Sequence, residues 1–473
     1  MVPPRVAGAG SGKASRAAVG FIRSESVLET AQPPAEENTT GRVAAWKGAL
    51  LRLACESDTR TAVGLWLLTR VGIGILVWIT VWTDASAKSR VPESVREVWE
   101  HWDWVRYLNI AENGYSLRKI HGASIAFFPG FPALLVVVHF LVRDWILTGL
   151  LISFVSGGIA CVALARLIRY EAEAREAREV AAGAAGIAST AQQEADGPEE
   201  PSTSPVSQAA ALQTAVLQTA EQRRRAAVSN GLTLFLFSPA AVFLAVGYTE
   251  AIFLAFALPA WLAARRGRWV LAGVLTAAAS AIRIDGVFLF VALAVMFLLT
   301  RPRGGRSWLH GSGLLISLVP PLGFFAYLYH LTGSWLAWSH AEAQGWDRTQ
   351  NDPLRTFRET WRYAFGRQIL PAAEAWEYQV EFLAMATGAA IVIWLLVRRR
   401  WPEAVYVGIP LLSLATSHVY LSVARELLLW WPLWAVVGVW AVRRPWVKTI
   451  VMTVQTPMMF IIAYLFFTGR WAG

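Results

Sequence analysis

The chain has 473 residues, of which 55% are hydrophobic and only 16% are charged, and it contains 24 tryptophans. A soluble protein of this length needs more charge to cover its surface, so the composition excludes a soluble globular protein. The net charge is +10, but the arginines form short clusters between apolar runs, which is typical of cytoplasmic membrane loops and argues against nucleic-acid binding.

Residues 1–60 are rich in Ala, Gly, Pro, Ser and Glu, and we expect them to form a disordered cytoplasmic tail. Residues 61–473 are expected to form a multi-span membrane domain, because apolar segments that can cross ~30 Å of hydrocarbon recur throughout them. About eleven or twelve such segments are predicted, at 62–82, 124–142, 145–168, 228–246, 249–264, 269–282, 286–300, 312–331, 379–397, 403–421, 427–442 and 449–467. The predicted fold class is therefore an all-α polytopic membrane protein.

Three polar segments interrupt this pattern. The segment 169–227 is rich in Ala, Glu, Gln and Arg and indicates a low-complexity insert that is partly helical at best. The positive-inside rule places 83–123 and 332–378 outside. This placement follows from the arginine clusters at 265–268, 301–306, 398–403 and 443–448, which the rule puts inside. The side of the insert stays open, because the proline-broken segment 124–142 need not cross fully.

The first outer loop contains HWDWVRYLNIAENGYS at 101–116. If 98–112 is helical, Asp103, Tyr107 and Ile110 share one face. The pattern predicts a short amphipathic helix that lies flat at the outer membrane surface. Such a helix would hold one carboxylate at the boundary between lipid and water.

The same helix is expected to place Trp102 and Arg106 on a neighbouring face and to align Trp99 with Trp102. Gly114 is expected to end it, and Tyr115 follows. A solvated surface charge is the competing interpretation of the carboxylate.

Other polar residues lie at the predicted outer ends of spans or in the second outer loop. They are Tyr248, Glu250, Arg283, Asp285, His340, Arg425 and Glu426. Ionisable residues at membrane depth are costly and usually face an internal cavity, so we expect these groups to converge on one outward cavity that accepts a lipid-linked anionic substrate. For each residue alone, a structural salt bridge such as Arg283–Asp285 is the alternative.

Several blocks resemble a known family. WDWVRYLNIAENGY with AFFPGFPALL resembles the first outer loop of Pig-V-type mannosyltransferases, which add the second mannose of the glycosylphosphatidylinositol anchor and have bacterial relatives. SPAAVFLAVGYTEAIF at 238–253 and ASAIRIDGVF at 279–288 resemble two further blocks. The resemblance covers most of the membrane part, without the tail and the insert. It implies a GT-C glycosyltransferase fold and a polyprenyl-phosphate sugar donor.

The resemblance also implies roles for residues. Asp103 stands where the superfamily has its catalytic acidic residue, Tyr248 and Glu250 match a Tyr-x-Glu pattern, and Arg283 matches the arginine of Arg-x-x-Gly. Asp285 stands where the eukaryotic enzymes usually have a neutral residue, so we expect a structural pair with Arg283.

An inverting transfer from a lipid phosphate needs one base, and we expect Asp103 to fill that role. One of Arg106, Arg283 and Arg425 would hold the phosphate. The predicted substrate-binding residues are Trp102, Arg106, Tyr107, Tyr115, Tyr248, Glu250, Arg283, His340 and Arg425. No metal-ligand spacing involves Cys55 or Cys161, and no DxD motif occurs in the outer loops, so no cofactor is certain, although a divalent metal stays possible.

The expected partners are the lipid-linked sugar donor and membrane lipids, without nucleic acid. The acceptor, a lipid, a glycan or a protein, is not specified by the sequence. The expected location is the bacterial plasma membrane, with the active site facing outside. A polytopic transporter or lipid flippase is the alternative function, although such proteins tend to show internal repeats, and no convincing repeat is visible.

Overall fold

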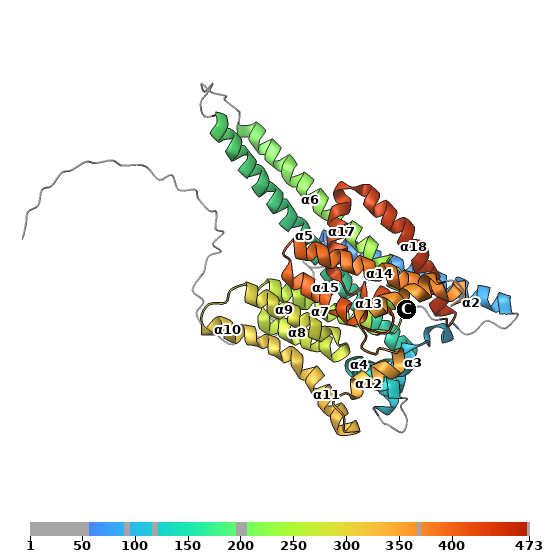
Figure 1. The fold of residues 1–473 in the computed structure, drawn as a ribbon. Helices are drawn as coiled ribbons and strands as arrows, with labels where there is room; N and C mark the ends of the chain where they lie inside the picture. Colours follow the sequence, from blue (N-terminus) through green and yellow to red (C-terminus); the bar gives the residue numbers. More distant parts are fainter. Residues whose placement is uncertain (1–55, 89–94, 116–121, 195–205, 367–369, 471–473) are drawn as a thin grey trace, which may run out of the picture. The chain divides into compact units, whose positions relative to one another are not determined.

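The computed structural model describes residues 56–88, 95–115, 122–194, 206–366 and 370–470, and all regular elements in these ranges are helices (Figure 1). Most of the predicted tail, together with Cys55, lies outside the described residues. Cys161 is buried and is not in a disulfide.

The helices follow one another with short connections. They are α2 (Ser57–Lys88), η1 (Glu97–Trp99), α3 (Asp103–Asn113), η2 (Gly122–Ala126), α4 (Gly130–Val142), α5 (Trp145–Glu194), α6 (Val206–Leu236), η3 (Ala241–Leu244), α7 (Thr249–Arg265), α8 (Trp269–Ile282), α9 (Asp285–Leu299), α10 (Gly305–Gly311), η4 (Ser312–Leu318), α11 (Val319–Thr332), α12 (Ala337–Trp346), α13 (Pro353–Phe365), α14 (Ala372–Val397), α15 (Trp401–Ala415), α16 (Val423–Glu426), α17 (Trp431–Arg443) and α18 (Pro445–Phe467).

Five helical segments among the described residues are long and apolar enough to cross a membrane. They are Ser57–Thr83, Trp145–Gly183, Gly305–Thr332, Glu374–Val397 and Pro445–Phe467. Large apolar side chains are exposed on them, such as Leu68 (66%) and Trp78 (60%) of α2, which lipid would cover. These features are those of an all-helical polytopic membrane protein. Spanning helices are fewer than the predicted apolar segments because several of those segments form helices of only 13 to 17 residues.

The segment 169–227 differs from its prediction, because its described part is helical throughout. Helix α5 continues without a break for 50 residues, and α6 packs against it. The parts of both helices that lie nearest the gap in the chain run away from the other helices (Figure 1). Alanine-rich sequence favours helix, and ion pairs such as Arg169–Glu221 (2.7 Å) and Arg224–Glu176 (2.7 Å) join the two helices. The composition of this segment, rich in Ala, Glu, Gln and Arg, is therefore that of two helices packed against each other.

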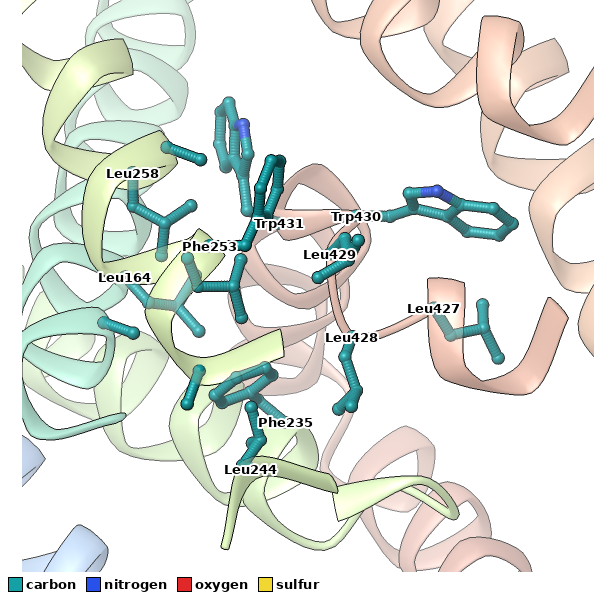
Figure 2. Close-up of a cluster of buried hydrophobic side chains, with 14 of the residues drawn as sticks. Leu164, Phe235, Leu244, Phe253, Leu258, Leu427, Leu428, Leu429, Trp430 and Trp431 are labelled. Atoms are coloured by element: carbon teal, nitrogen blue, oxygen red, sulfur yellow. The ribbon is translucent and has the colours of Figure 1, made fainter. Parts of the chain in front are cut away.

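Helix α7 lies at the centre and is buried on nearly all sides, as a helix that is apolar all round should be. It packs against α5, α8 and α9. Figure 2 shows Phe253 and Leu258 of α7 in one cluster with Leu164 of α5 and residues 427–431, which connect α16 to α17 and begin α17. This packing fixes α16 against the start of α7, where the polar residues of both elements meet.

Candidate active site

Helix α3 begins at Asp103, not near residue 98 as predicted. The short helix η1 ends at Trp99, and Trp102 has a φ of 54°, which lies in the left-handed region and interrupts the helix. The predicted alignments of Trp102 with Trp99 and with Arg106 on helical faces are therefore wrong.

The predicted face of α3 that Asp103, Tyr107 and Ile110 share is confirmed, and this face is buried. Asp103, Trp104, Tyr107 and Ile110 are all buried. Gly114 ends the helix as expected, with a φ of 63° and its N–H donating to the Ile110 carbonyl at 2.9 Å. The helix thus begins with a carboxylate that points into the protein.

The Trp104 ring sets how closely α3 approaches the other helices. It lies against Gly149 of α5 and Gly247, which precedes α7. A Cβ atom at these positions would come within 2.4 Å and 2.6 Å of ring atoms. Only glycine therefore leaves room for the indole next to Asp103.

Tyr248 holds the start of α3. Its hydroxyl accepts a hydrogen bond from the Asp103 backbone N–H (3.1 Å) and donates one to the His101 carbonyl (3.0 Å). Because Tyr248 directly precedes α7, this phenol ties the first residue of α3 to the central helix. It acts on the position of Asp103 without lining a cavity around it.

The Asp103 carboxylate is 7% exposed and ion-paired, which excludes a solvated surface charge. Its Oδ2 accepts a hydrogen bond from Arg425 Nη1 at 2.9 Å. Arg425 also donates from Nε (3.0 Å) and Nη2 (2.6 Å) to Glu250 Oε1. Its guanidinium lies 4.6 Å from the centre of the Phe243 ring, a distance typical of a cation–π contact.

Arg283 joins the same network. Its Nε donates to Asp285 Oδ2 (2.8 Å), its Nη1 to Glu250 Oε1 (3.2 Å) and its Nη2 to Glu426. The expected structural pair with Asp285 is present. A single oxygen of Glu250 therefore connects the two arginines.

The turn that carries Arg283 is tight. A Cβ atom at Gly286 would lie 2.3 Å from the backbone N and Cα of Ser280. The glycine allows the start of α9 to fold back against α8, which fixes the guanidinium between them.

In this network, four carboxylates share two arginines. The second carboxylate oxygens of Glu250 and Glu426 are buried and have no hydrogen-bond partner within the part of the chain that the structure describes. Burial raises the pKa of Glu426 to about 8, and the neighbouring Asp285 carboxylate adds to the rise. Protonation of Glu426 near neutral pH would lower the excess of negative charge.

A small cavity of about 110 Å³ opens beside the network. Asp103, Tyr107, Arg283, Arg425 and Glu426 line one side of it. Another part is lined by Trp338, Glu342 and Trp346 of α12 and by Arg348, which follows α12. Arg348 Nη1 donates to Glu342 Oε2 at 3.0 Å, and burial raises the pKa of Glu342.

A larger cavity of about 940 Å³ adjoins the small one. Asp103 and Trp346 line both cavities. The larger cavity is also lined by Trp102, Arg106, Tyr363 and Tyr378. Asp103 is thus a buried carboxylate at the boundary between a charged recess and a wider aromatic space.

Arg106 is the cationic side chain of this wider space that lacks an ion pair among the described residues. Its Nη1 is 3.5 Å from Ser124 Oγ, and its guanidinium is 5.6 Å from the centre of the Trp346 ring. Arg283 and Arg425, by contrast, are both bound by carboxylates.

Four predicted substrate-binding residues line neither cavity. Tyr248 and Glu250 hold Asp103 and the arginines, as described above, and the other two are Tyr115 and His340. The Tyr115 hydroxyl donates to the Phe127 carbonyl at 2.5 Å, and its ring packs against Phe324, so Tyr115 joins the end of α3 to the residues before α4. His340 of α12 is exposed. The ionisable residue of α12 that lines the small cavity is instead Glu342, two positions away.

Sequence reasoning missed Glu381 as well as Glu342 and Arg348. The Glu381 carboxylate accepts hydrogen bonds from the backbone N–H groups of Ser422 (3.0 Å), Val423 (2.6 Å) and Ala424 (3.2 Å). These groups directly precede Arg425. A signal was present, because Glu381 lies inside an apolar segment, where an ionisable residue usually has a specific partner.

No group of three or more His, Cys, Asp or Glu side chains suited to a metal ion occurs in the ranges that the structure describes. Asp103, Glu250, Asp285 and Glu426 all accept hydrogen bonds from arginines instead. We therefore assign no residues to the divalent metal that the sequence left possible.

Compared with protein-family models, curated proteins and solved structures, the chain gives no match.

Proposed function

We propose that this protein is a membrane glycosyltransferase with a GT-C fold. It would move a sugar, which the family resemblance implies to be mannose, from a polyprenyl-phosphate donor to an acceptor hydroxyl at the outer face of the bacterial plasma membrane. The observation that carries the proposal is the position of Asp103, a buried carboxylate at the boundary of two cavities and paired with Arg425.

In the proposed reaction the acceptor hydroxyl oxygen attacks the anomeric carbon. The bond between that carbon and the phosphate oxygen breaks, and its electron pair leaves with the lipid phosphate. The hydroxyl proton passes to Asp103. The anomeric configuration inverts, and one carboxylate is enough because the phosphate is already a good leaving group.

The wider cavity suits a sugar and its acceptor. A space of about 940 Å³ falls within the range of ligand pockets, and Trp102, Trp346, Tyr363 and Tyr378 give it aromatic walls against which sugar rings can pack. Asp103 lies at its edge, as a group must that takes a proton from a bound hydroxyl.

Arg106 is the best-supported group for the donor phosphate. It lies one helical turn after Asp103 on α3 and has no carboxylate partner among the described residues. A guanidinium can stabilise the phosphate as its negative charge grows. Arg283 and Arg425 would instead hold Glu250 and Asp103 in place.

The test replaces Asp103 with Asn, which keeps the shape and removes the base. Membranes carrying the variant are assayed for transfer from radiolabelled polyprenyl-phosphate mannose, and we expect a loss of roughly 100-fold to 10,000-fold. Glu112→Gln is the matched control, because Glu112 lies on the same helix and is exposed.

Full transfer by an inserted D103N protein would remove Asp103 as the base. Lipid flipping or solute uptake by the wild type in vesicles, without a new glycoside, would favour the transporter class instead.

A further inference from the structure

A third cavity lies between α5, α14 and α17, and we call it the α5–α14–α17 groove. It has a volume of about 600 Å³. Much of its wall is apolar and includes Ile391 and Trp394 of α14 and Val436, Val437 and Trp440 of α17. A space of this size and lining can take an alkyl chain.

Two arginines at the groove have no carboxylate partner among the residues that the structure describes. Arg398 directly follows α14, and its guanidinium lies 5.9 Å from the centre of the Trp394 ring. Arg178 of α5 is exposed. Neither makes an ion pair with any other described residue, and both line the groove.

The carboxylates that line the groove are, by contrast, already paired. Glu171 accepts from Arg400 at 2.7 Å. Glu179 accepts from Arg175 at 3.1 Å and also from Arg443. The groove therefore presents a surplus of positive charge next to an apolar wall.

The groove lies far from Asp103 along helix α5. Trp104, beside Asp103, packs on Gly149 near the start of α5, whereas the groove is lined by Glu171 to Glu179 of the same helix. At about 1.5 Å per residue these points are roughly 33 to 45 Å apart, which is at least the ~30 Å thickness of the hydrocarbon layer. Where α5 crosses a bilayer, this separation puts the groove and the candidate active site at opposite surfaces.

We propose that the α5–α14–α17 groove is a binding site for one anionic phospholipid of the leaflet opposite Asp103. The phosphate group contacts Arg178 and Arg398, and an acyl chain lies along Ile391, Val436 and Val437. Basic pockets between transmembrane helices bind anionic headgroups in this way, and tryptophans are common at that depth. The site is independent of the proposed transfer reaction, because it involves none of the residues around Asp103.

The test uses the purified full chain in detergent and native mass spectrometry. Phosphatidylglycerol and phosphatidylcholine are added separately, and the bound fraction is measured at each lipid concentration. We expect the wild type to bind phosphatidylglycerol roughly 25-fold more tightly, since each arginine contributes about fivefold. The R178Q/R398Q double variant should lose this preference.

The matched control is R266Q/R268Q, which removes the same charge from two exposed arginines between α7 and α8. It should keep the preference of the wild type. If the double groove variant does not fold, the exposed single variant R178Q should still lose about fivefold.

Three outcomes would overturn the proposal. They are equal binding of the two lipids by the wild type, an equal loss in the control, and stabilisation against heat by inorganic phosphate alone that matches the effect of phosphatidylglycerol.

Discussion

Arg425 donates a 2.9 Å hydrogen bond to Asp103 across 322 positions of sequence. The pair joins the first residue of α3 to the four-residue helix α16. Arg425 is itself held by Glu250 of the central helix α7, so Asp103 is positioned by the core of the protein and not by its own loop.

Replacing Arg425 with Lys should lower both stability and transfer. Lysine keeps the positive charge but cannot make three separate hydrogen bonds to Asp103 and Glu250 in the same geometry. Replacement by Ala should cost about 3–5 kcal/mol, because it leaves the buried Asp103 carboxylate unpaired and leaves Glu250 with Arg283 alone. Thermal unfolding in detergent measures the change. R355Q, on the exposed face of α13, is the control and should change little.

Glu250→Gln should destabilise the protein by a similar ~3–5 kcal/mol. The Glu250 side chain is fully buried, and one of its oxygens bridges Arg283 and Arg425. Without the carboxylate, two guanidinium groups share a buried site with less negative charge. An unfolding temperature equal to that of the wild type would contradict the bridging role.

Gly149→Ala should disturb α3. The new Cβ atom would meet the Trp104 ring at 2.4 Å, so the indole and the helix that carries it must shift, at a cost of about 1–3 kcal/mol. Gly72→Ala in α2 is the control, because nothing lies within 4 Å of its Cβ position. There, helix propensity should make the change neutral or slightly stabilising. Equal effects of the two variants on unfolding would argue against the contact.

The pH dependence of stability should include a contribution from Glu426. Its pKa is about 8 in the folded protein and about 4.5 when unfolded, so the folded state binds the proton more tightly. The contribution of protonated Glu426 to the free energy of unfolding is fully present below pH ~4.5 and is lost as the pH rises through ~8. Relative to E426Q, the wild type should therefore unfold at progressively lower temperature between about pH 5 and pH 9. If the difference in unfolding temperature between the wild type and E426Q is the same at every pH in this range, Glu426 is not a buried, protonated carboxyl group.

Glu381 should act as a positioning residue for Arg425. Glu381→Ala leaves three buried backbone N–H groups without their acceptor, at a cost of about 1–3 kcal/mol or more. Glu381→Gln keeps one acceptor and should recover part of both stability and transfer. Glu374→Gln, at the exposed start of α14, is the control. If E381A unfolds like the control, the carboxylate does not hold the α16 segment.

Local patterns in the sequence predicted part of the site. Helical spacing correctly placed Asp103, Tyr107 and Ile110 on one buried face, and glycine correctly marked the end of that helix at Gly114. The Arg283–Asp285 pair was also expected, because the two residues are neighbours in the turn between α8 and α9. Each of these features depends on residues that are close in the chain.

The remaining features depend on contacts that periodicity does not contain. The break at Trp102 follows from a left-handed backbone conformation that the residue type does not favour, and Tyr248 stabilises the helix start that follows it. Glu342 lines the cavity and His340 does not, and this depends on which side of α12 faces the cavity. Pairing of Asp103 with Arg425 depends on how α7 packs against both ends of the network.

The length of the unbroken helix α5 indicates how far it extends beyond a membrane. At about 1.5 Å per residue, its 50 residues extend for roughly 75 Å, more than twice the hydrocarbon thickness of a bilayer. The stretch that leads to Glu194 must therefore project into water on the side away from Asp103. An experiment that shows on which side of the cell membrane this stretch of α5 lies would also show that Asp103 lies on the opposite side.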